Sequence, residues 1–362
     1  MGFKCGIVGL PNVGKSTLFN ALTRSNAAQA ENYPFCTIDP NIGMVEVPDA
    51  RLAQLAALVS PQKVIPAAME FVDIAGLVAG AADGEGLGNR FLAHIREVDA
   101  IAHVVRAFED DAVTHVAERA DPAADIETVN TELLLADIET AGKAQQRAES
   151  RAKSGDKEQI ALRDLLAEVK QQLESGVAVR AMQLEDAQRE ALKPCCFLSA
   201  KAAIYIANIG EDGGGDRLRA VEEIAARERA KTVALCAAIE GELAGLSEEE
   251  AAPFLAEMNL REPGLARLIR AGYELLGLHT FFTAGPKEVR AWTVRIGARA
   301  PEAAGAIHTD FEKGFIRAET VSFDDYLRHN GEHGAKEAGR LRLEGKDYVV
   351  ADGDVMHFRF NV

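Results

Sequence analysis

The stretch Gly9-Leu10-Pro11-Asn12-Val13-Gly14-Lys15-Ser16-Thr17 indicates the fold of this chain, because it matches the pattern G-x-x-x-x-G-K-S/T. A strand-like run at residues 3–8 precedes it, and a helical pattern over Lys15–Thr23 follows. In that context, glycines let backbone N–H groups wrap phosphate oxygens, and the helix N-terminus adds partial positive charge. Lys15 would reach the β- and γ-phosphates, and the Ser16 hydroxyl would ligate Mg²⁺. We therefore expect a nucleoside triphosphate to bind at Asn12, Val13, Gly14, Lys15, Ser16 and Thr17.

Two further segments supply the groups that such a loop needs around the γ-phosphate. Asp73-Ile74-Ala75-Gly76 ends a later core strand, where Asp73 would hold the magnesium through a water and the Gly76 N–H would sense the γ-phosphate. Thr37 lies where a first switch loop belongs, and its hydroxyl would complete the Mg²⁺ shell. A purely structural aspartate at a strand end is the plainer alternative for Asp73. The expected catalytic residues thus include Lys15, Thr37 and Gly76, and the expected metal ligands are Ser16, Thr37 and Asp73.

The composition bounds the class of protein. The chain has 362 residues, of which 48% are hydrophobic, and a formal net charge of -16. This length suits two or three domains. The charge excludes non-specific coating of nucleic acid, so any RNA contact must be a local basic patch. No apolar run approaches the ~20 residues of a membrane span, and the five cysteines lack zinc-binding spacing. We expect a cytoplasmic protein with neither a membrane nor DNA as a partner.

Strand-like and helical segments alternate along much of the chain. The expected strands are residues 3–8, 68–73, 100–106, 203–207 and 232–236. Such alternation predicts an α/β fold with a parallel sheet covered by helices on both faces. Between the third and fourth strands, the helical runs Ile126–Arg151 and Ile160–Leu173 are joined by a turn at 154–157 and should fold back on each other. They indicate either an arm inserted into the nucleotide-binding domain or an ordinary surface hairpin.

The last part of the chain has a different character. From about residue 278 acidic and basic residues are nearly balanced, and strand-like runs alternate with helical or turn segments. This pattern predicts a small C-terminal α+β domain. Its strand-like runs are residues 288–294, 314–320, 348–351 and 356–360.

The residues after the fourth predicted strand indicate which base binds. GTPases read guanine with N-K-x-D, whose aspartate accepts two hydrogen bonds, whereas this chain has Asn208-Ile209-Gly210-Glu211, without the lysine and with a longer acid. A polar site rejects the wrong ligand by roughly 10⁴–10⁵-fold when its groups are left unpaired. Losing the aspartate removes that selection for guanine, so both ATP and GTP stay open as ligands on these residues alone. A plain polar turn is the alternative. The expected base site also includes Cys236 and Ala237, which follow the fifth strand.

Five segments together resemble the YchF/Obg-like ATPase family over essentially the whole chain: Gly9–Thr17, Asn32–Thr37, Asp73–Leu77, Gly84–Asn89 and His308–Arg317. The resemblance implies a Ras-like P-loop NTPase domain at 1–124 and 197–277, an inserted α-helical coiled-coil arm at 125–196, and a C-terminal TGS domain of ubiquitin-like β-grasp fold at 278–362. It implies ATP hydrolysis and binding to the ribosome or ribosomal RNA, with the large subunit as the expected partner. In that family the N-x-x-E loop goes with ATP, so Asn208, Ile209 and Glu211 would form the adenine side of the site.

The position that orients the attacking water departs from small GTPases. They place a glutamine after D-x-x-G, and this chain has Leu77, whose apolar side chain cannot orient water. Intrinsic hydrolysis should therefore be slow. His94, His103 and His115 are candidates for the missing group because an imidazole can polarise water near neutral pH, although a core or surface role is the plainer reading of each. The family resemblance favours His115 as the catalytic residue.

Two more partners are suggested by individual side chains. The side-chain carbonyl of Asn12 would help to hold K⁺ near the phosphates. Phosphate contacts and stacking on Phe311 and Phe315 would bind RNA, although a solvated charged face explains the same residues. The basic residues concerned are Lys143, Arg147, Arg151, Lys153 and Lys157 in the arm, and Lys287, Arg290, Arg295, Arg299, Lys313 and Arg317 in the C-terminal domain.

Three functions remain open on these grounds. The first is a slow ATPase that acts as a nucleotide-dependent switch on the ribosome. The second is a ribosome-associated GTPase of the Obg class. The third is a binding module in which the nucleotide sets the conformation and hydrolysis is incidental.

Overall fold

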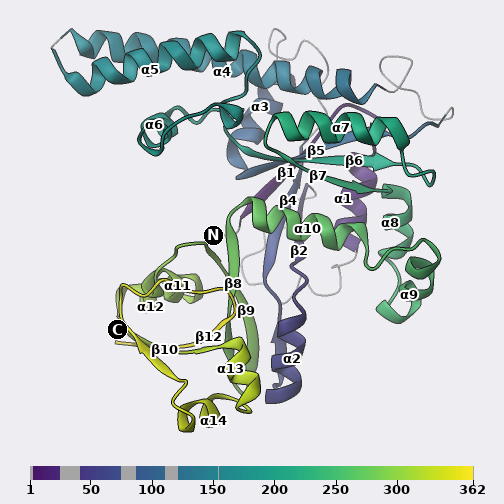
Figure 1. Cartoon of the computed structure of the whole chain (residues 1–362), viewed down its shortest axis with the longest axis vertical. Coiled ribbons are helices and arrows are strands. Elements are labelled where there is room, and N and C mark those ends of the chain that lie inside the picture. The colour runs from purple at the N-terminus through teal and green to yellow at the C-terminus, as the bar shows by residue number, and fades with distance from the viewer. Residues whose placement is uncertain (1–2, 25–40, 75–86, 111–120, 154, 362) are drawn as a thin grey trace.

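The computed structural model describes residues 3–24, 41–74, 87–110, 121–153 and 155–361. Figure 1 shows a central α/β unit, a long helical arm on one side of it and a second sheet with short helices on the other. Several expected site residues, Thr37, Gly76, Leu77 and His115 among them, lie outside the described residues. Within these residues, no helix combines the length and apolar character needed to cross a membrane.

The first sheet carries six strands in the order β2-β4-β1-β5-β6-β7. Five of them are parallel, as the sequence predicts, whereas β2 pairs antiparallel with β4 at the edge. The predicted parallel sheet therefore carries one antiparallel edge strand, β2, which the sequence pattern did not reveal. The strands are β1 (Lys4–Val8), β2 (Ile42–Glu46), β4 (Ala68–Asp73), β5 (Ala100–Ala107), β6 (Ala202–Ile209) and β7 (Lys231–Leu235).

Helices cover both faces of this sheet, and its central strands β5 and β6 are accordingly mostly apolar and buried. Every residue of β5 is buried. On one face Val105 and Tyr205 pack with α7 (Gly215–Arg227) and the start of α4, and on the other Ile204 and Ile206 belong to the core that includes α10 (Gly264–Leu275) (Figure 1). The remaining helices are α1 (Lys15–Arg24), α3 (Leu87–Glu97), α8 (Ala237–Leu243) and α9 (Glu248–Glu257).

The inserted arm is a long antiparallel helix pair. α4 (Pro122–Ala152) has 31 residues, which gives a length of about 46 Å. Asp121 caps it by accepting hydrogen bonds from two backbone N–H groups, and Asp156 does the same for α5 (Lys157–Glu174). Alanines of α4 pack against the apolar stripe of α5, so the pair has a core of its own. The predicted fold-back is confirmed, and Figure 1 shows the pair projecting from the α/β unit as an arm.

A short connection returns the chain from the arm to the first sheet. It contains η2 (Val179–Ala181), α6 (Asp186–Leu192) and η3 (Lys193–Cys195). The buried carboxylate of Asp137 on α4 accepts hydrogen bonds from the N–H groups of Leu198 and Ser199, each at 2.8 Å. Desolvation raises the pKa of Asp137, and these hydrogen bonds oppose the shift. The return segment is therefore tied to the base of the arm.

The C-terminal domain is built on a second sheet in the order β11-β10-β12-β8-β9-β3. Its fold class, α+β, is confirmed. The run 348–351 is not a strand, because Val349 makes only an isolated bridge to Arg299. The strands are β8 (Leu278–Ala284), β9 (Glu288–Arg295), β10 (Phe315–Ser322), β11 (Arg342–Glu344) and β12 (Asp354–Phe360), and the helices are α11 (Ala300–Ile307), α12 (Thr309–Lys313), α13 (Phe323–Arg328) and α14 (Glu332–Glu337).

One strand of the second sheet comes from the first third of the chain. β3 (Lys63–Ile65) pairs parallel with β9, and the preceding helix α2 (Ala50–Val59) packs against β8, β9 and α13 of the C-terminal domain. Leu52 and Leu55 of α2 lie in the same apolar core as Phe282 of β8. Residues 50–65 therefore join the two units through a sheet and through a shared core.

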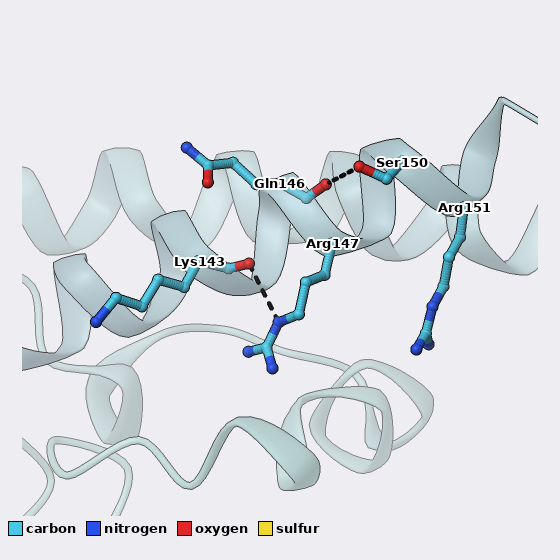
Figure 2. A pocket seen from close by; sticks show the side chains of 5 residues that line it. All are labelled: Lys143, Gln146, Arg147, Ser150 and Arg151. Carbon is cyan, nitrogen blue, oxygen red and sulfur yellow. Dashed lines mark hydrogen bonds between the residues drawn. The ribbon is translucent and has the colours of Figure 1, made fainter.

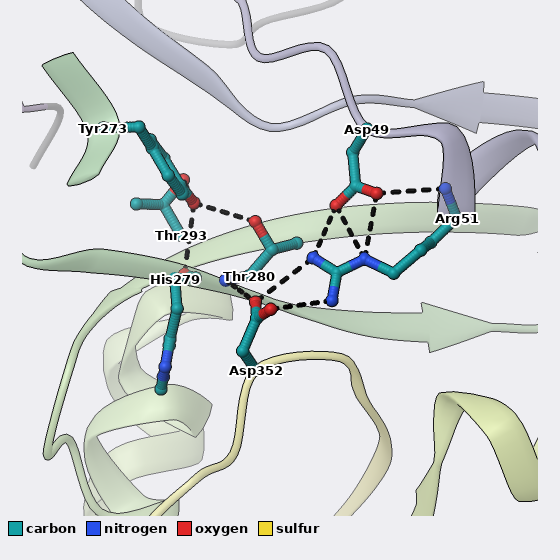
Figure 3. A network of polar contacts seen from close by, with 7 residues as sticks. All are labelled: Asp49, Arg51, Tyr273, His279, Thr280, Thr293 and Asp352. Atoms are coloured by element: carbon teal, nitrogen blue, oxygen red, sulfur yellow. Dashed lines mark hydrogen bonds and ion pairs between the residues drawn. The ribbon is translucent and has the colours of Figure 1, made fainter. Parts of the chain in front are cut away.

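A polar network reinforces this junction (Figure 3). Arg51, at the start of α2, binds Asp49 on its own segment and Asp352 of the C-terminal domain. Asp352 also accepts a hydrogen bond from the Thr280 N–H at 3.0 Å. The two carboxylates flank one guanidinium, and their hydrogen bonds and charges raise the pKa of Arg51. The guanidinium therefore stays charged and clamps the two units together.

Candidate nucleotide-binding site

The loop after β1 has the backbone shape of a phosphate cradle. Gly9, Asn12 and Gly14 have φ angles of 149°, 61° and 98°. A Cβ on Gly9 would lie 2.4 Å from the Val104 carbonyl oxygen, and a Cβ on Gly14 would lie 2.3 Å from Asn208 Nδ2. Only glycine therefore fits at both positions. Turns of this kind direct successive N–H groups into a shared hollow that suits an anion.

Lys15 lies at the point where this loop becomes α1. The side chain is 8% exposed, and its ammonium donates a hydrogen bond of 2.6 Å to the Leu10 carbonyl within the loop. Burial lowers the pKa of Lys15, and the nearby Asp73 carboxylate partly offsets that shift. The structure thus brings the lysine back over the cradle, which is the place that the sequence pattern predicts for it. Phosphate oxygens would replace the Leu10 carbonyl as acceptors.

Asp73 reaches the same edge of the sheet from the neighbouring strand. It is the last residue of β4, and it is in register with Ile7 of β1. Burial raises the pKa of Asp73, and the charge of Lys15 opposes this shift. Ser16 lies exposed in the first turn of α1. A hydroxyl and a carboxylate are hard oxygen donors of the kind that Mg²⁺ prefers, so the residues present fit this ion.

Asn208 joins three loops of the site. Its Nδ2 donates to the Val13 carbonyl at 2.9 Å, and its Oδ1 accepts from the Ala237 N–H at 2.9 Å. The side chain is 5% exposed. It therefore links the loop after β1 to the start of α8 from the position before the last residue of β6. The structure assigns this amide a positioning role, and the adenine contact expected of Asn208 stays a prediction.

The other expected base-site residues border this bridge. Ala237 is buried at the start of α8, and its Cβ lies 3.8 Å from the position of a Cβ on Gly14. Cys236 caps that helix, and Ile209 packs beside Gly214. Glu211 is exposed. The structure thus brings the segments after β6 and β7 to one side of the phosphate cradle, and their contact with a base stays a prediction.

Of the three candidate histidines, the structure describes two. His94 is an exposed residue of α3. His103 is 3% exposed within β5, with its ring centroid 5.3 Å from that of Tyr205. Burial, together with the charges of Arg180 and Lys15, lowers the pKa of His103 to about 3, so its imidazole is neutral. The proposal that His103 polarises an attacking water is wrong, because the ring lies in the core.

Sequence reasoning missed a buried carboxylate next to the base side of the site. Glu240 of α8 is 2% exposed and accepts the N–H groups of Gly264 and Leu265 at 2.7 and 3.1 Å. It caps α10 from a neighbouring helix and so fixes α8 beside Asn208. The sequence clue is weak, because the segment Ala237–Leu243 carries two acids, Glu240 and Glu242, and nothing in it identifies the partner.

Sequence reasoning also missed a buried polar network that includes Tyr205 of β6. Arg180, at the base of the arm, forms an ion pair with Glu228. The Tyr205 hydroxyl donates to Glu228 at 2.6 Å, and Asn130 Nδ2 donates to the same carboxylate at 2.7 Å. These groups come from four separate segments, so no local pattern could have revealed them. The network ties the arm to the sheet that carries the site.

Three of the five basic residues expected on the arm line one surface of α4 (Figure 2), whereas Lys153 and Lys157 are not among the residues that line it. Lys143, Arg147 and Arg151 line an open hollow of about 640 Å³ together with Gln146 and Ser150. Arg147 Nε donates to the Lys143 carbonyl at 3.2 Å, and Lys143 forms an ion pair with Glu139. The one-turn spacing of the three cations places them along a single face of the helix.

The aromatic residues expected to stack on RNA differ in exposure. Phe315 is 5% exposed and belongs to the core of the C-terminal domain, so its proposed stacking role is wrong. Phe311 stacks on Phe360 with ring centroids 3.8 Å apart. Arg290 lies over the ring of Trp292 at 3.9 Å, and Arg299 pairs with Asp347.

Two family models match this chain, one in its N-terminal part and one in its C-terminal part. Residues 4–135 match a family model described as 50S ribosome-binding GTPase, and residues 278–361 match the YchF-GTPase_C model, described as a protein of unknown function. Proteins named ribosome-binding ATPase YchF are similar over 100% of both chains. The identities are 59% for Haemophilus influenzae, 57% for Escherichia coli O157:H7 and 54% for Bacillus subtilis.

Solved structures agree with this match. The structure of the YchF GTPase from Schizosaccharomyces pombe has 37% identity and a TM-score of 0.86, and the match covers 99% of this chain and 98% of that one. A GTP-binding protein from Pyrococcus horikoshii OT3 shares the fold at 20% identity, with a TM-score of 0.62 and coverage of 99% and 100%. Full-length identity at this level, with a P-loop, an arm and a C-terminal sheet in one chain, shows that the protein belongs to the YchF family.

Proposed function

We propose that this protein is an ATPase that binds the ribosome and acts there as a nucleotide-dependent switch. The observation that carries the proposal is the placement of Lys15. Its ammonium lies over a cradle built by Gly9 and Gly14 and next to the carboxylate of Asp73. Relatives that share the full length of the chain are named ribosome-binding ATPases. The protein would act where ribosomes are, in the cytoplasm.

The proposed metal is Mg²⁺ bound with the nucleotide. Ser16, Thr37 and Asp73 would hold it, directly or through water. When bound, the ion neutralises charge on the β- and γ-phosphates. Asn12 has a left-handed backbone and an exposed side chain at the rim of the cradle, so its carbonyl oxygen would help to hold K⁺.

The residues of the chain would act mainly by positioning. Lys15 and the loop N–H groups would bind the phosphate oxygens and stabilise charge as the phosphoryl group transfers. The Gly76 N–H would bind the γ-phosphate. Leu77 cannot orient water, so hydrolysis without a partner is expected to be slow, with His115 as the candidate that polarises the water.

Base selection would depend on the segment after β6. Glu211 replaces the aspartate that reads guanine, and Ile209 replaces the lysine beside it. With Asn208 engaged by Val13 and Ala237, Ile209 and the segment Cys236–Ala237 are left to form the wall against adenine. Relatives are named both as ATPases and as GTPases, so GTP binding is the principal alternative.

The ribosome contact is proposed for the arm, through RNA phosphates, with the large subunit as partner. The support is the row of cations formed by Lys143, Arg147 and Arg151 on a chain whose net charge is -16. We further propose that the arm comprises 125–196, the nucleotide-binding domain 1–124 and 197–277, and the TGS domain 278–362. β3 and α2 would then be the part of the nucleotide-binding domain that completes the TGS sheet.

The decisive experiment measures the affinity for ATP and for GTP by displacement of a fluorescent nucleotide. The expected result is tighter binding of ATP. A double variant, Ile209→Lys with Glu211→Asp, recreates N-K-x-D and should move the ratio towards GTP. Tighter binding of GTP by the unmodified protein would instead support the Obg-class GTPase.

A second measurement separates the switch from a binding module with incidental hydrolysis. Single-turnover hydrolysis is followed with and without purified ribosomes. A switch should hydrolyse ATP faster when ribosomes are present, because the missing water-orienting group needs a partner. Equal rates would favour the binding module, for which Leu77 in place of glutamine is the supporting observation.

A further inference from the structure

The C-terminal domain carries a cluster of potential metal ligands far along the chain from the nucleotide site. It consists of Glu319 on β10, His357 on β12 and Glu332 at the start of α14. One ligand atom from each residue lies within 4.8 Å of the other two. Glu319 and His357 are direct cross-strand partners, and α14 brings the third group to them. Two rigid strands therefore fix two of the three ligands.

A small cavity lies among the same three side chains. Its volume is about 10 Å³, and apolar residues, among them Val355 and Tyr326, form the rest of its lining. A cavity of ~10–15 Å³ holds roughly one water. The space therefore suits a single ion or water and excludes an organic ligand.

Arg359 holds the carboxylate of Glu319, one of these three residues, in place through hydrogen bonds. Its Nε and Nη2 donate to the two oxygens of Glu319 at 3.2 and 3.0 Å. A carboxylate has about four lone-pair sites, so it can bind an arginine and a metal together. Metal-binding carboxylates are commonly held by such outer hydrogen bonds.

We propose that Glu319, Glu332 and His357 form a Zn²⁺ site that fastens α14 to the C-terminal sheet. One imidazole nitrogen and two carboxylate oxygens make a donor set that zinc accepts, with water in the fourth position. Mg²⁺ and Ca²⁺ favour all-oxygen shells with more ligands. His357 is exposed, so the ion can enter from solvent. The site is separate from the proposed ATPase centre and does not depend on it.

The test uses the untagged full-length chain, freed of metal and without nucleotide. Isothermal titration with Zn²⁺ should give one equivalent bound at this site, and Zn²⁺ should raise the melting temperature. His357→Ala and Glu332→Gln should each weaken the affinity by at least about tenfold, since loss of even an outer-shell partner costs 10–100-fold. Glu337→Gln, on the same helix and paired with His333, is the matched control and should leave binding unchanged.

Cobalt reports which ligands are used. Co²⁺ should give visible bands of a nitrogen- and oxygen-bound ion, without the charge-transfer absorption of a thiolate. Thiolate absorption would place the ion at the cysteines, such as Cys195 and Cys196, and would overturn the proposal. The absence of stoichiometric binding would also overturn it, as would binding that neither His357→Ala nor Glu332→Gln weakens.

Discussion

Both carboxylate oxygens of Asp352 accept hydrogen bonds from the guanidinium of Arg51, at 2.8 and 3.1 Å, although 301 residues separate the two in sequence. Arg51 starts α2, and Asp352 lies in the loop before β12. The same guanidinium lies 5.3 Å from the centre of the Phe282 ring. The pair therefore joins the nucleotide-binding unit to the C-terminal unit at the point where β3 enters the second sheet.

Removing this link should destabilise the whole chain. We expect Asp352→Ala to lower the free energy of unfolding by about 1–2 kcal/mol, near the lower end for hydrogen bonds to charged groups because the side chain is half exposed. Denaturant unfolding followed by circular dichroism measures this. Asp347→Ala, which removes only a surface pair with Arg299, should change nothing measurable. Equal stability of Asp352→Ala and the parent would contradict the role assigned to the link.

The same link should depend on pH in a defined direction. Arg51 and the Thr280 N–H hold the pKa of Asp352 below its ordinary value of 3.8. Its contribution is therefore complete above that value, and it is lost as the pH falls through the lower folded-state pKa. The stability difference between the parent and Asp352→Ala should shrink only in strong acid. A difference that already vanishes near pH 5 would show that another group is responsible.

Glycine at position 14 should be indispensable, unlike a glycine of the arm. Gly14→Ala places a Cβ 2.3 Å from Asn208 Nδ2 at a φ of 98°, so it should break the bridge to Val13 and abolish ATP binding. Gly142→Ala lies in α4 with nothing within 4 Å, and it should stabilise the chain by about 0.5–1 kcal/mol. Thermal melts and nucleotide titrations compare the two. Wild-type ATP affinity in Gly14→Ala would refute the proposed cradle.

Lys15 should be needed for the hydrolysis of ATP. We expect Lys15→Ala to lower the single-turnover rate by about 10²–10³-fold, the usual cost of losing one donor to a developing negative charge. Lys157→Ala, an exposed lysine at the start of α5, is the control and should hydrolyse ATP normally without ribosomes. Circular dichroism checks that each variant is folded. Full activity of Lys15→Ala would show that the site is misplaced.

His103 should make the chain sensitive to mild acid. Its folded-state pKa of about 3 lies below the ordinary value of 6.5. Between these values the unfolded chain binds a proton that the folded chain does not, so stability should fall as the pH drops below 6.5. The expected slope is up to about 1.4 kcal/mol per pH unit from this residue. In His103→Leu this contribution should disappear, and unfolding curves at several pH values would detect it. An unchanged slope would mean that His103 is protonated in the folded state.

Local sequence was sufficient to predict the phosphate cradle. Gly9, Gly14 and Lys15 are near neighbours in the chain, and the backbone angles that they adopt depend mostly on residue type and on the strand and helix beside them. The arm was predictable for a similar reason, since the apolar stripe of Ile160–Leu173 repeats at the helical period. The prediction failed where the pattern was short. β3 has only three residues, and residues 348–351 look like a strand but make one bridge.

The sequence by itself therefore determined the contiguous parts of this protein: the phosphate-binding turn, the two arm helices and the alternation of strands and helices. The tertiary structure alone decided that Asn208 holds Val13, that Glu240 caps α10 and that β3 completes a distant sheet. It also decided that His103 is a core residue, because burial depends on neighbours from other strands. Bond geometry and side-chain period act over a few residues, whereas these contacts join segments that meet only when the whole core packs.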